Sequence, residues 1–339
     1  MIDDDFHQDV ASTLTLDIRN LHTHFDTRAG TLRAVDGVNL RIKRGEIVGL
    51  VGESGSGKSV TGFSVIGLVD PPGRIVGGEV RFQGRNLVGL EEEALRQLRG
   101  HDIAMIFQDP MMTLNPVLRI STQMVEAITA HEIVAEDEAL ERAHDALASV
   151  GIPHPEERLR DYPHQFSGGM RQRVAIAIAL LHNPALIIAD EPTTALDVTI
   201  QGQILAVVQR LVAERGTSLL WITHDLSVVA GLAHRVAVMY AGRIVEEGPV
   251  DEVLDHPMHP YTAGLIASLP SHNRRGTRLA QIPGMAPPAH DRPTGCSFRP
   301  RCARATAECE QDPPATTPAQ GRSLRCFNPM PAGSQGGRA

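Results

Sequence analysis

The stretch GEIVGLVGESGSGKS, from Gly45 to Ser59, decides the fold of this chain. Its first half is a near-continuous apolar run, which is typical of a buried parallel strand. Its second half fits G-x-x-x-x-G-K-[ST], and KSVTGFSVIGLV after it has helical spacing of apolar residues. A glycine-rich turn without a ligand is the alternative, but a loop between a buried strand and a helix is where this motif binds phosphates. The stretch therefore predicts a nucleotide-binding protein of the α/β class.

The residues of this loop have separate predicted roles. Gly55 and Gly57 let the backbone curl so that successive N–H groups point at an anion, and the helix N-terminus adds positive potential. We expect Lys58 to reach the β- and γ-phosphates and the Ser59 hydroxyl to bind Mg²⁺. The complete predicted set is Gly52, Ser54, Gly55, Ser56, Gly57, Lys58, Ser59 and Val60.

Two further apolar runs end in acids. ALIIAD, from Ala185 to Asp190, and SLLWITHD, from Ser218 to Asp225, suit parallel strands covered on both faces. Asp190 is placed to hold Mg²⁺ through water, and the adjacent Glu191 could polarise the attacking water. An acid pair satisfied by a helix N-terminus would be the alternative for an isolated Asp-Glu. Beside a phosphate-binding loop, the pair indicates binding and hydrolysis of a nucleoside triphosphate.

A second glycine stretch, FSGGMRQRVAIAIALL, places Ser167, Gly168 and Gly169 at the start of a strongly helical run. Such a helix N-terminus is a second anion-ready site, although a plain N-cap with flexible glycines is the alternative. One chain then offers two phosphate cradles, of which only the first carries a lysine. The economical solution is two chains head to tail, each Ser-Gly-Gly closing over the nucleotide of the other.

Six motifs occur in an order that resembles the ATPase subunits of the ATP-binding cassette (ABC) family. Within about residues 14–250 they are the loop at Gly52, FQDP at Phe107, SGG at Ser167, ADEP at Ala189, ALD at Ala195 and THD at Thr223. The resemblance implies an α/β P-loop ATPase with an antiparallel β subdomain, which we expect to be built from short strands at 14–48 with turns at DTRAG and DG. It also implies a helical subdomain at about 110–170 and a nucleotide sandwich that holds ATP and Mg²⁺.

The same resemblance implies roles for residues outside the loop. Gln108 would sense the γ-phosphate and the membrane partner and would join Ser59 and Asp190 around Mg²⁺. His224 would contact the γ-phosphate and would act with Glu191 in catalysis.

Three more positions complete the predicted site. Asp197 would sit at the dimer seam, and Phe25 is the candidate to stack on adenine, with a core position on a strand as its alternative. Met170 stands where the general family signature has Gln. Because Met170 keeps its backbone N–H, we expect the anion site at Ser167 to survive this departure.

Composition narrows the class of ATPase. The chain of 339 residues has a formal charge of −8 and no long basic block, which argues against a nucleic-acid partner. Its longest apolar stretch, VAIAIALL, is far shorter than the roughly 20 residues of a spanning helix, and MIDDDFHQDV is no secretory signal. We expect a transporter subunit, peripheral at the cytoplasmic face of the cell (inner) membrane, that works through two separate membrane-spanning permease subunits.

The C-terminal region refines the class further. HPMHPYTAGLIASLP, from His256 to Pro270, and the GCSFRPRC region resemble the extension of ATPase subunits from dipeptide and oligopeptide importers. The resemblance implies peptide cargo, a paralogous second ATPase subunit and a peptide-binding protein outside the membrane. Import of nickel or another small solute, or a non-transport ABC-type switch, are the alternatives. Turn and packing roles are expected for the histidines at 256 and 259.

All four cysteines lie near the end of the chain, at spacings C-x5-C, C-x6-C and C-x16-C: Cys296, Cys302, Cys309 and Cys326. These spacings lack the C-x2-C of zinc ribbons and suit a 4Fe–4S cluster, which the family resemblance also implies; zinc and free thiols stay open. We expect an acidic tail at 1–13, the ATPase domain at 14–250, an extension at 251–326 stapled by metal, and a disordered tail at 327–339.

Overall fold

The computed structural model describes residues 14–28, 30–194, 196–273, 276 and 279–331. It divides into two compact units, each assembled from segments distant in sequence. The helical unit holds the described parts of 1–16, 42–46 and 82–222, and the P-loop unit holds those of 17–41, 47–81 and 223–339. Strand β3 (Ile47–Val51) pairs with a strand that begins at Arg235, and this pairing joins two segments of the P-loop unit that are distant in sequence. The expected acidic tail at 1–13 lies outside the described residues.

The P-loop unit contains most of a β-sheet formed by the N-terminal third of the chain. Strands β1 (Leu14–Thr27), β2 (Gly30–Lys43) and β4 (Gly73–Phe82) neighbour one another in the order β2-β1-β4. The expected short strands were wrong for this region, since β1 and β2 have 14 residues each. The expected turn at Asp36-Gly37 is also wrong: Gly37 takes a φ of 73° inside β2, and the strand continues past it.

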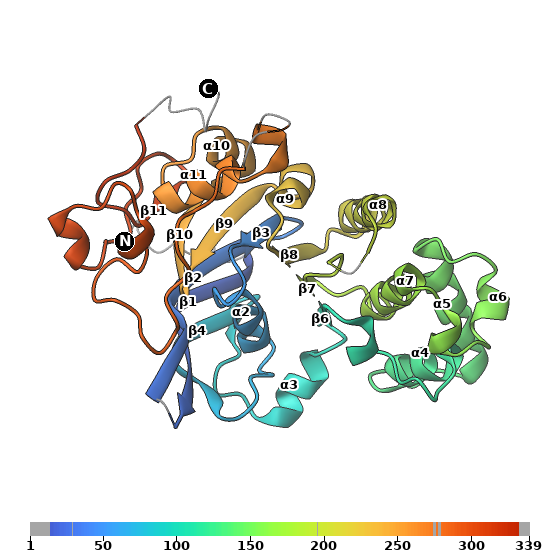
Figure 1. Cartoon of the computed structure of the whole chain (residues 1–339). Helices are drawn as coiled ribbons and strands as arrows, with labels where there is room; N and C mark the ends of the chain where they lie inside the picture. Colours follow the sequence, from blue (N-terminus) through green and yellow to red (C-terminus); the bar gives the residue numbers. More distant parts are fainter. Residues whose placement is uncertain (1–13, 29, 195, 274–275, 277–278, 332–339) are drawn as a thin grey trace, which may run out of the picture. The chain divides into compact units, whose positions relative to one another are not determined.

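The same unit holds a second group of strands. β3 is fully buried and pairs in parallel with β9 (Arg235–Tyr240), as its apolar run predicts. β10 (Arg243–Pro249) pairs antiparallel with β9, and β11 (Ser323–Leu324) pairs antiparallel with β10. The helices of this unit are α2 (Lys58–Val65), α9 (Leu226–Leu232), α10 (Val250–Asp255) and α11 (Pro260–Ala267), with short 3₁₀ turns η3 (Pro270–His272), η4 (Arg299–Arg301) and η5 (Ala307–Glu310) (Figure 1).

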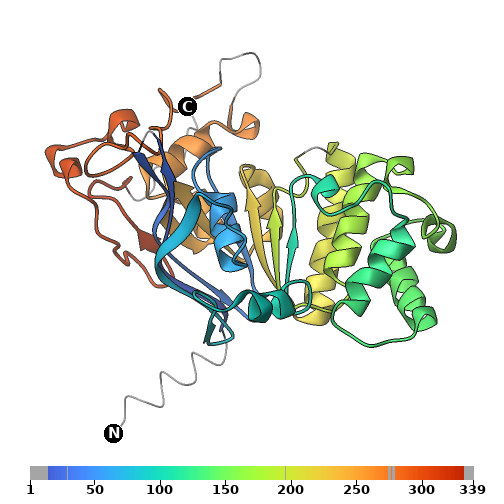
Figure 2. The same cartoon turned by 90° about the horizontal axis from the view of Figure 1, so that it is seen from below.

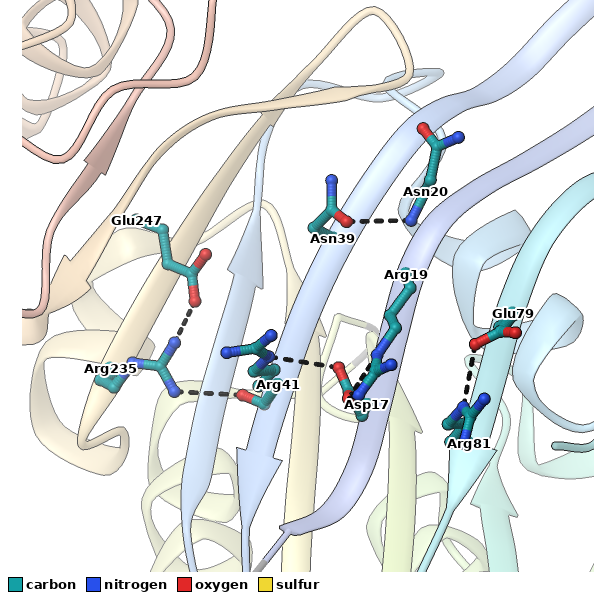
Figure 3. A network of polar contacts seen from close by, with 9 residues as sticks. All are labelled: Asp17, Arg19, Asn20, Asn39, Arg41, Glu79, Arg81, Arg235 and Glu247. Atoms are coloured by element: carbon teal, nitrogen blue, oxygen red, sulfur yellow. Dashed lines mark hydrogen bonds and ion pairs between the residues drawn. The ribbon is translucent and has the colours of Figure 1, made fainter. Parts of the chain in front are cut away.

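Charged side chains connect the two groups of strands across the P-loop unit (Figure 3). Asp17 on β1 accepts hydrogen bonds from Arg19 at 2.7 Å and from Arg41 on β2 at 3.3 Å. Arg235 on β9 donates to the Arg41 carbonyl at 3.1 Å and pairs with Glu247 on β10. The network therefore fixes β1 and β2 relative to β9 and β10.

The helical unit combines parallel strands with a cluster of helices. β6 (Ile103–Ile106), β7 (Leu186–Asp190) and β8 (Ser218–Thr223) lie side by side, β6 and β8 each parallel to β7. The other elements are β5 (Arg85–Asn86), α3 (Glu92–Leu98), η1 (Pro110–Met112), α4 (Ile120–Thr129), α5 (Glu136–Ser149), α6 (Pro155–Arg158), η2 (Pro163–Gln165), α7 (Gly168–Ala179) and α8 (Val198–Arg215).

Helices α4, α5 and α7 pack together in this cluster (Figures 1 and 2). On α5 the buried positions are Ala139, Ala143 and Leu147, one apolar stripe at a spacing of four residues. Helix α5 begins at Glu136. Glu132 precedes it and accepts hydrogen bonds from the Arg142 guanidinium, which holds the Glu132 pKa down at about 2.

The C-terminal extension is held by more contacts than the sequence suggests. Besides the pairing of β11 with β10, the guanidinium of Arg322 forms a buried ion pair with Glu246. The expected disorder of 327–339 is wrong for 327–331: Asn328 exchanges hydrogen bonds with Arg304, and the Met330 N–H donates to the Met258 carbonyl at 2.8 Å. Residues 332–339 lie outside the described part.

Candidate nucleotide-binding site

The loop between β3 and α2 has the conformation that the glycine motif predicts. Gly55 and Gly57 have φ angles of 76° and 106°, in the left-handed region that favours glycine. A Cβ on Gly57 would lie 2.3 Å from the Ala34 carbonyl oxygen, and one on Gly52 would lie 2.1 Å from that of Met239. The loop therefore admits no side chain at these two positions, and its backbone is what faces a ligand.

Lys58 opens helix α2 and is buried, with 4% of its surface exposed. Its ammonium donates to the carbonyl oxygens of Gly52 at 2.9 Å and Glu53 at 3.1 Å, so it lies over the loop. Ser56 is also buried, and its hydroxyl has no hydrogen-bond partner among the described residues. A buried cation, an orphaned hydroxyl and a curled glycine backbone together fit a bound phosphate group. Ser54 is exposed, and Ser59 and Val60 follow Lys58 in the first turn of α2.

In the helical unit, the predicted acids stand at the carboxyl end of β7. Asp190 is its last residue and is 4% exposed. Glu191 has a φ of 46°, a strained conformation for a residue with a side chain. The Glu191 N–H donates to the Ile222 carbonyl at 2.9 Å, and its carboxylate accepts from the Thr194 hydroxyl at 3.0 Å. These bonds fix the direction of the carboxylate.

Gln108 reaches the same edge as the acids. It follows β6 by two residues and is exposed, and β6 pairs in parallel with β7 so that Ile106 stands opposite Ala189. The carboxyl ends of parallel strands meet at one edge of a sheet, so Gln108 and Asp190 leave the sheet at the same side. The Asp109 carboxylate accepts from the Met111 N–H at 2.9 Å and caps η1.

The Ser-Gly-Gly motif forms the beginning of α7. Ser167 is the N-cap, and its hydroxyl accepts from the Met170 N–H at 3.3 Å. A Cβ on Gly169 would lie 2.7 Å from Cγ2 of Ile200 on α8, so close helix packing also requires glycine there. Asp197 is the N-cap of α8, and its carboxylate accepts from the Ile200 N–H at 2.9 Å. Gly168 and Asp197 are exposed.

Two predicted residues lie elsewhere in the P-loop unit. His224 is exposed between β8 and α9, where Asp225 caps the helix by accepting from the Ser227 N–H at 2.8 Å. Phe25 is partly buried on β1, and its ring lies against Gly73, where a Cβ would come within 2.5 Å of it. Phe25 thus packs against Gly73 on one side, and its stacking on adenine stays a prediction.

Sequence reasoning missed a group of residues around Glu53, the second position of the loop. Both carboxylate oxygens of Glu53 accept hydrogen bonds from the guanidinium of Arg301, and its N–H donates to the hydroxyl of Tyr261. The only available signal was an acid at a variable loop position and an arginine beside a cysteine in FRPRC.

The four cysteines line one small cavity of about 10 Å³ together with Phe298 and Phe327: Cys296, Cys302, Cys309 and Cys326. None forms a disulfide. Burial raises the pKa of three of these thiols, that of Cys326 to about 11, and the neighbouring sulfurs add to the shift. No three of their Sγ atoms, in the part of the chain described, lie within 4.8 Å of one another. A tetrahedral zinc site with Zn–S bonds of about 2.3 Å would need sulfurs about 3.8 Å apart.

Of the two histidines for which turn and packing roles are expected, His259 is buried and His256 is exposed at a bend. His259 is fully buried and caps α11, since its Nδ1 accepts from the Tyr261 N–H at 3.0 Å. Burial lowers the pKa of His259 to about 3. The His256 carbonyl accepts from Arg322 at 3.0 Å. Across the described residues, no helix combines the length and apolarity needed to cross a bilayer.

Comparison with known proteins first defines the class. A model of the ABC transporter family matches residues 35–194. Two solved cassettes share the fold. One is a dimeric structure of the ATP-binding cassette MJ0796 bound to ADP and Pi, with a TM-score of 0.63 and 29% identity, covering 69% of this chain and 98% of that one. The other is cbiO1 from Clostridium perfringens, with a TM-score of 0.61 and 29% identity, covering 71% of this chain and 90% of that one. The chain thus has the ABC ATPase fold that the six motifs predict.

Relatives then define the branch of the family. A model described as "Oligopeptide/dipeptide transporter, C-terminal region" matches residues 245–309. The chain is 46% identical over 315 residues to the dipeptide transport ATP-binding protein DppD of Haemophilus influenzae, covering 93% of this chain and 96% of that protein. It is 50% identical over 317 residues to a probable peptide ABC transporter ATP-binding protein of Sinorhizobium fredii, covering 93% and 95%. The chain therefore belongs to the ATP-binding subunits of dipeptide/oligopeptide ABC transporters, which confirms the resemblance.

Proposed function

We propose that this chain hydrolyses ATP to drive uptake of dipeptides or oligopeptides through separate membrane-spanning subunits. The observation that carries the proposal is the curled glycine loop over the buried Lys58 ammonium, in a chain whose C-terminal region matches the peptide-transporter model. Its partners are two permease subunits, a peptide-binding protein outside the membrane, and a second ATPase subunit that is a paralogue of this chain. The chain works at the cytoplasmic face of the cell membrane.

The residues act on ATP in distinct ways. The backbone N–H groups of the loop and Lys58 bind the phosphates, and Ser59, Gln108 and Asp190 hold Mg²⁺. Glu191, with its carboxylate oriented by Thr194, positions the attacking water, and His224 contacts the γ-phosphate. Ser167, Gly168, Gly169 and Met170 present the N-terminus of α7 to the nucleotide of the second ATPase subunit.

The experiment compares Glu191→Gln with the wild-type chain in the purified transporter. Glutamine keeps the shape of the side chain but cannot serve as a base. We expect ATP to bind with unchanged affinity, hydrolysis to fall at least about 100-fold, and ATP-bound dimers to accumulate. Peptide added with its binding protein should stimulate the wild-type ATPase and not the variant. Hydrolysis by Glu191→Gln at the wild-type rate would refute the assignment of Glu191, and absence of stimulation by any peptide would refute the cargo.

We further propose that the cysteine cavity holds a 4Fe–4S cluster. Four thiols around one cavity are a suitable donor set, and their Sγ atoms stand wider than one zinc ion requires. A cubane cluster suits such wider spacing because each cysteine binds a different iron. Bound there, the cluster would crosslink the turns at 296–302, 309 and 326. Anaerobic purification should yield iron, sulfide and absorption at about 400 nm; stoichiometric zinc without iron would refute the proposal.

A further inference from the structure

Glu53, in the phosphate-binding loop, forms three hydrogen bonds with two residues of the C-terminal region. The Tyr261 hydroxyl accepts from its N–H at 2.9 Å, and Nη1 and Nη2 of Arg301 donate to its two carboxylate oxygens at 2.8 and 3.0 Å. Two parallel bonds from one guanidinium fix both the distance and the orientation of a carboxylate. The start of the loop is therefore positioned by side chains 208 and 248 residues away in sequence.

Arg301 is itself immobilised and only 6% exposed. Its Nε donates to the Pro283 carbonyl at 2.9 Å, and Nη1 also lies 3.3 Å from the Tyr240 hydroxyl. The guanidinium carbon stands 5.8 Å and 6.0 Å from the ring centroids of Tyr240 and Phe298. Burial alone would lower the Arg301 pKa, but the bonds to Glu53 and Tyr240 raise it, so the charge is maintained.

The backbone of Arg301 belongs to the turn between two cysteines. Arg301 is the last residue of η4, and its N–H donates to the Phe298 carbonyl at 3.0 Å. The next residue, Cys302, donates to the Arg299 carbonyl at 3.2 Å. These two bonds place Cys302 in the same hydrogen-bonded turn as the backbone that carries the Arg301 guanidinium.

On the other side of the ion pair, Glu53 is connected to the lysine of the loop. The Glu53 carbonyl accepts from the Lys58 ammonium at 3.1 Å and from the Ser56 N–H at 3.2 Å. A change in the position of Glu53 therefore changes the position of the two groups, Lys58 and the Ser56 amide, that would meet a phosphate.

We propose that Arg301 is a positioning residue for ATP, which couples the turn at 296–302 to phosphate binding through Glu53. The proposal rests on the proposed binding of ATP by this loop. It adds that the cysteine segment is a part of the nucleotide site, so that ATP affinity depends on the order of that segment. Because coupling is reciprocal, bound ATP in turn rigidifies the segment.

The first test measures binding of a fluorescent ATP analogue to the full-length chain. Arg301→Met should weaken binding about tenfold, and Arg301→Lys should give an intermediate loss, because lysine keeps the charge but not the paired bonds. The matched control is Arg299→Met, in the same turn: Arg299 pairs with the exposed Glu310 at 3.5 Å, and we expect its loss to change affinity less than twofold. Glu53→Gln combined with Arg301→Met should bind no more weakly than Arg301→Met alone, since both changes break the same pair.

The second test is hydrogen exchange with and without Mg-ATP. In the wild-type chain ATP should slow exchange at the amides of Arg299, Arg301 and Cys302, and in Arg301→Met this protection should be lost at the first and last of these positions and at the substituted one. Should Arg301→Met not fold, Arg301→Lys and Glu53→Gln carry both measurements. If the wild-type chain binds ATP, but Arg301→Met binds within twofold of it and keeps the protection, the positioning role is refuted. If the wild-type chain itself binds no ATP, the proposed function fails instead.

Discussion

Replacing Arg322, which is buried in the C-terminal extension, should destabilise the extension strongly even though Arg322 binds no metal. The Glu246 carboxylate is 1% exposed, and its ion-pair partner Arg322 is 6% exposed. Arg322→Met leaves the carboxylate buried with only the N–H groups of Met258 and His259, at 2.8 and 2.9 Å. Breaking a buried pair in this way costs about 3–5 kcal/mol. Since two hydrogen bonds to Glu246 remain, we expect about 3 kcal/mol.

The assay is urea unfolding of the full-length chain, with hydrogen exchange at Met258 and His259 as a local probe. If the unfolding free energy falls by about 3 kcal/mol per molar urea, a loss of about 3 kcal/mol shifts the urea midpoint by about 1 M. Glu246→Gln added to Arg322→Met should restore part of the loss, with a coupling energy of at least about 1.5 kcal/mol.

The control is the half-exposed Arg299 in the same extension, whose replacement by Met should cost under about 0.5 kcal/mol. A loss below about 1 kcal/mol for Arg322→Met, or strict additivity with Glu246→Gln, would refute the reasoning. The extension would then depend on its cysteines alone, as the sequence suggested.

Three further predictions follow from other parts of the structure. Gly57→Ala should reduce ATP affinity at least about tenfold, because the added Cβ meets the Ala34 carbonyl at 2.3 Å. Gly55→Ala should reduce the affinity less, because no atom lies within 4 Å of its Cβ. Nucleotide titration of both variants checks this, and equal losses of affinity would contradict it. The pKa of Glu132 is lowered to about 2 by Arg142, so its stabilisation is present above pH 4.5 and is lost as pH falls toward 2. Glu132→Gln should therefore destabilise the chain by about 0.5–1 kcal/mol at neutral pH, after discounting for solvent screening, and a gap that persists in acid denaturation would contradict the assignment. His259 stays neutral in the folded chain down to about pH 3, whereas in the unfolded chain it binds a proton below about pH 6.5, so the free energy of unfolding should fall as the pH drops from 6.5 toward 3. His259→Asn keeps a cap for α11 and should reduce this pH dependence of the unfolding free energy, which unfolding at a series of pH values measures.

The nucleotide loop could be predicted from the sequence because its determinants are local. A buried strand, glycines at positions that exclude a Cβ and a lysine at the start of a helix all lie within fifteen residues. The N-cap position of Ser167 was accessible for the same reason. In contrast, the turn read at Asp36-Gly37 failed because a glycine in the left-handed region interrupts the period-two pattern without ending the strand.

The contacts of the extension could not be predicted because they depend on pairs far apart in the chain. Arg301 finds Glu53 across 248 positions, and Arg322 finds Glu246 across 76. Nothing in the local pattern around an arginine specifies which carboxylate it will bind. The extension at 251–326, which has few apolar residues, was therefore expected to be held by metal ligation alone. The charges were visible in the sequence, but their partners were not.

The close packing of Gly169 on Ile200 makes the first turns of α7 and α8 a single mechanical piece. A displacement of Ser167, the cap of α7, should therefore also displace Asp197, the cap of α8, without involving this chain's own phosphate-binding loop. Val198, in that first turn and 84% exposed, is therefore a suitable attachment point for a spectroscopic label. In the proposed head-to-tail dimer, such a label would report the nucleotide bound by the neighbouring subunit, and in a pair of unlike subunits it would distinguish the two ATP molecules.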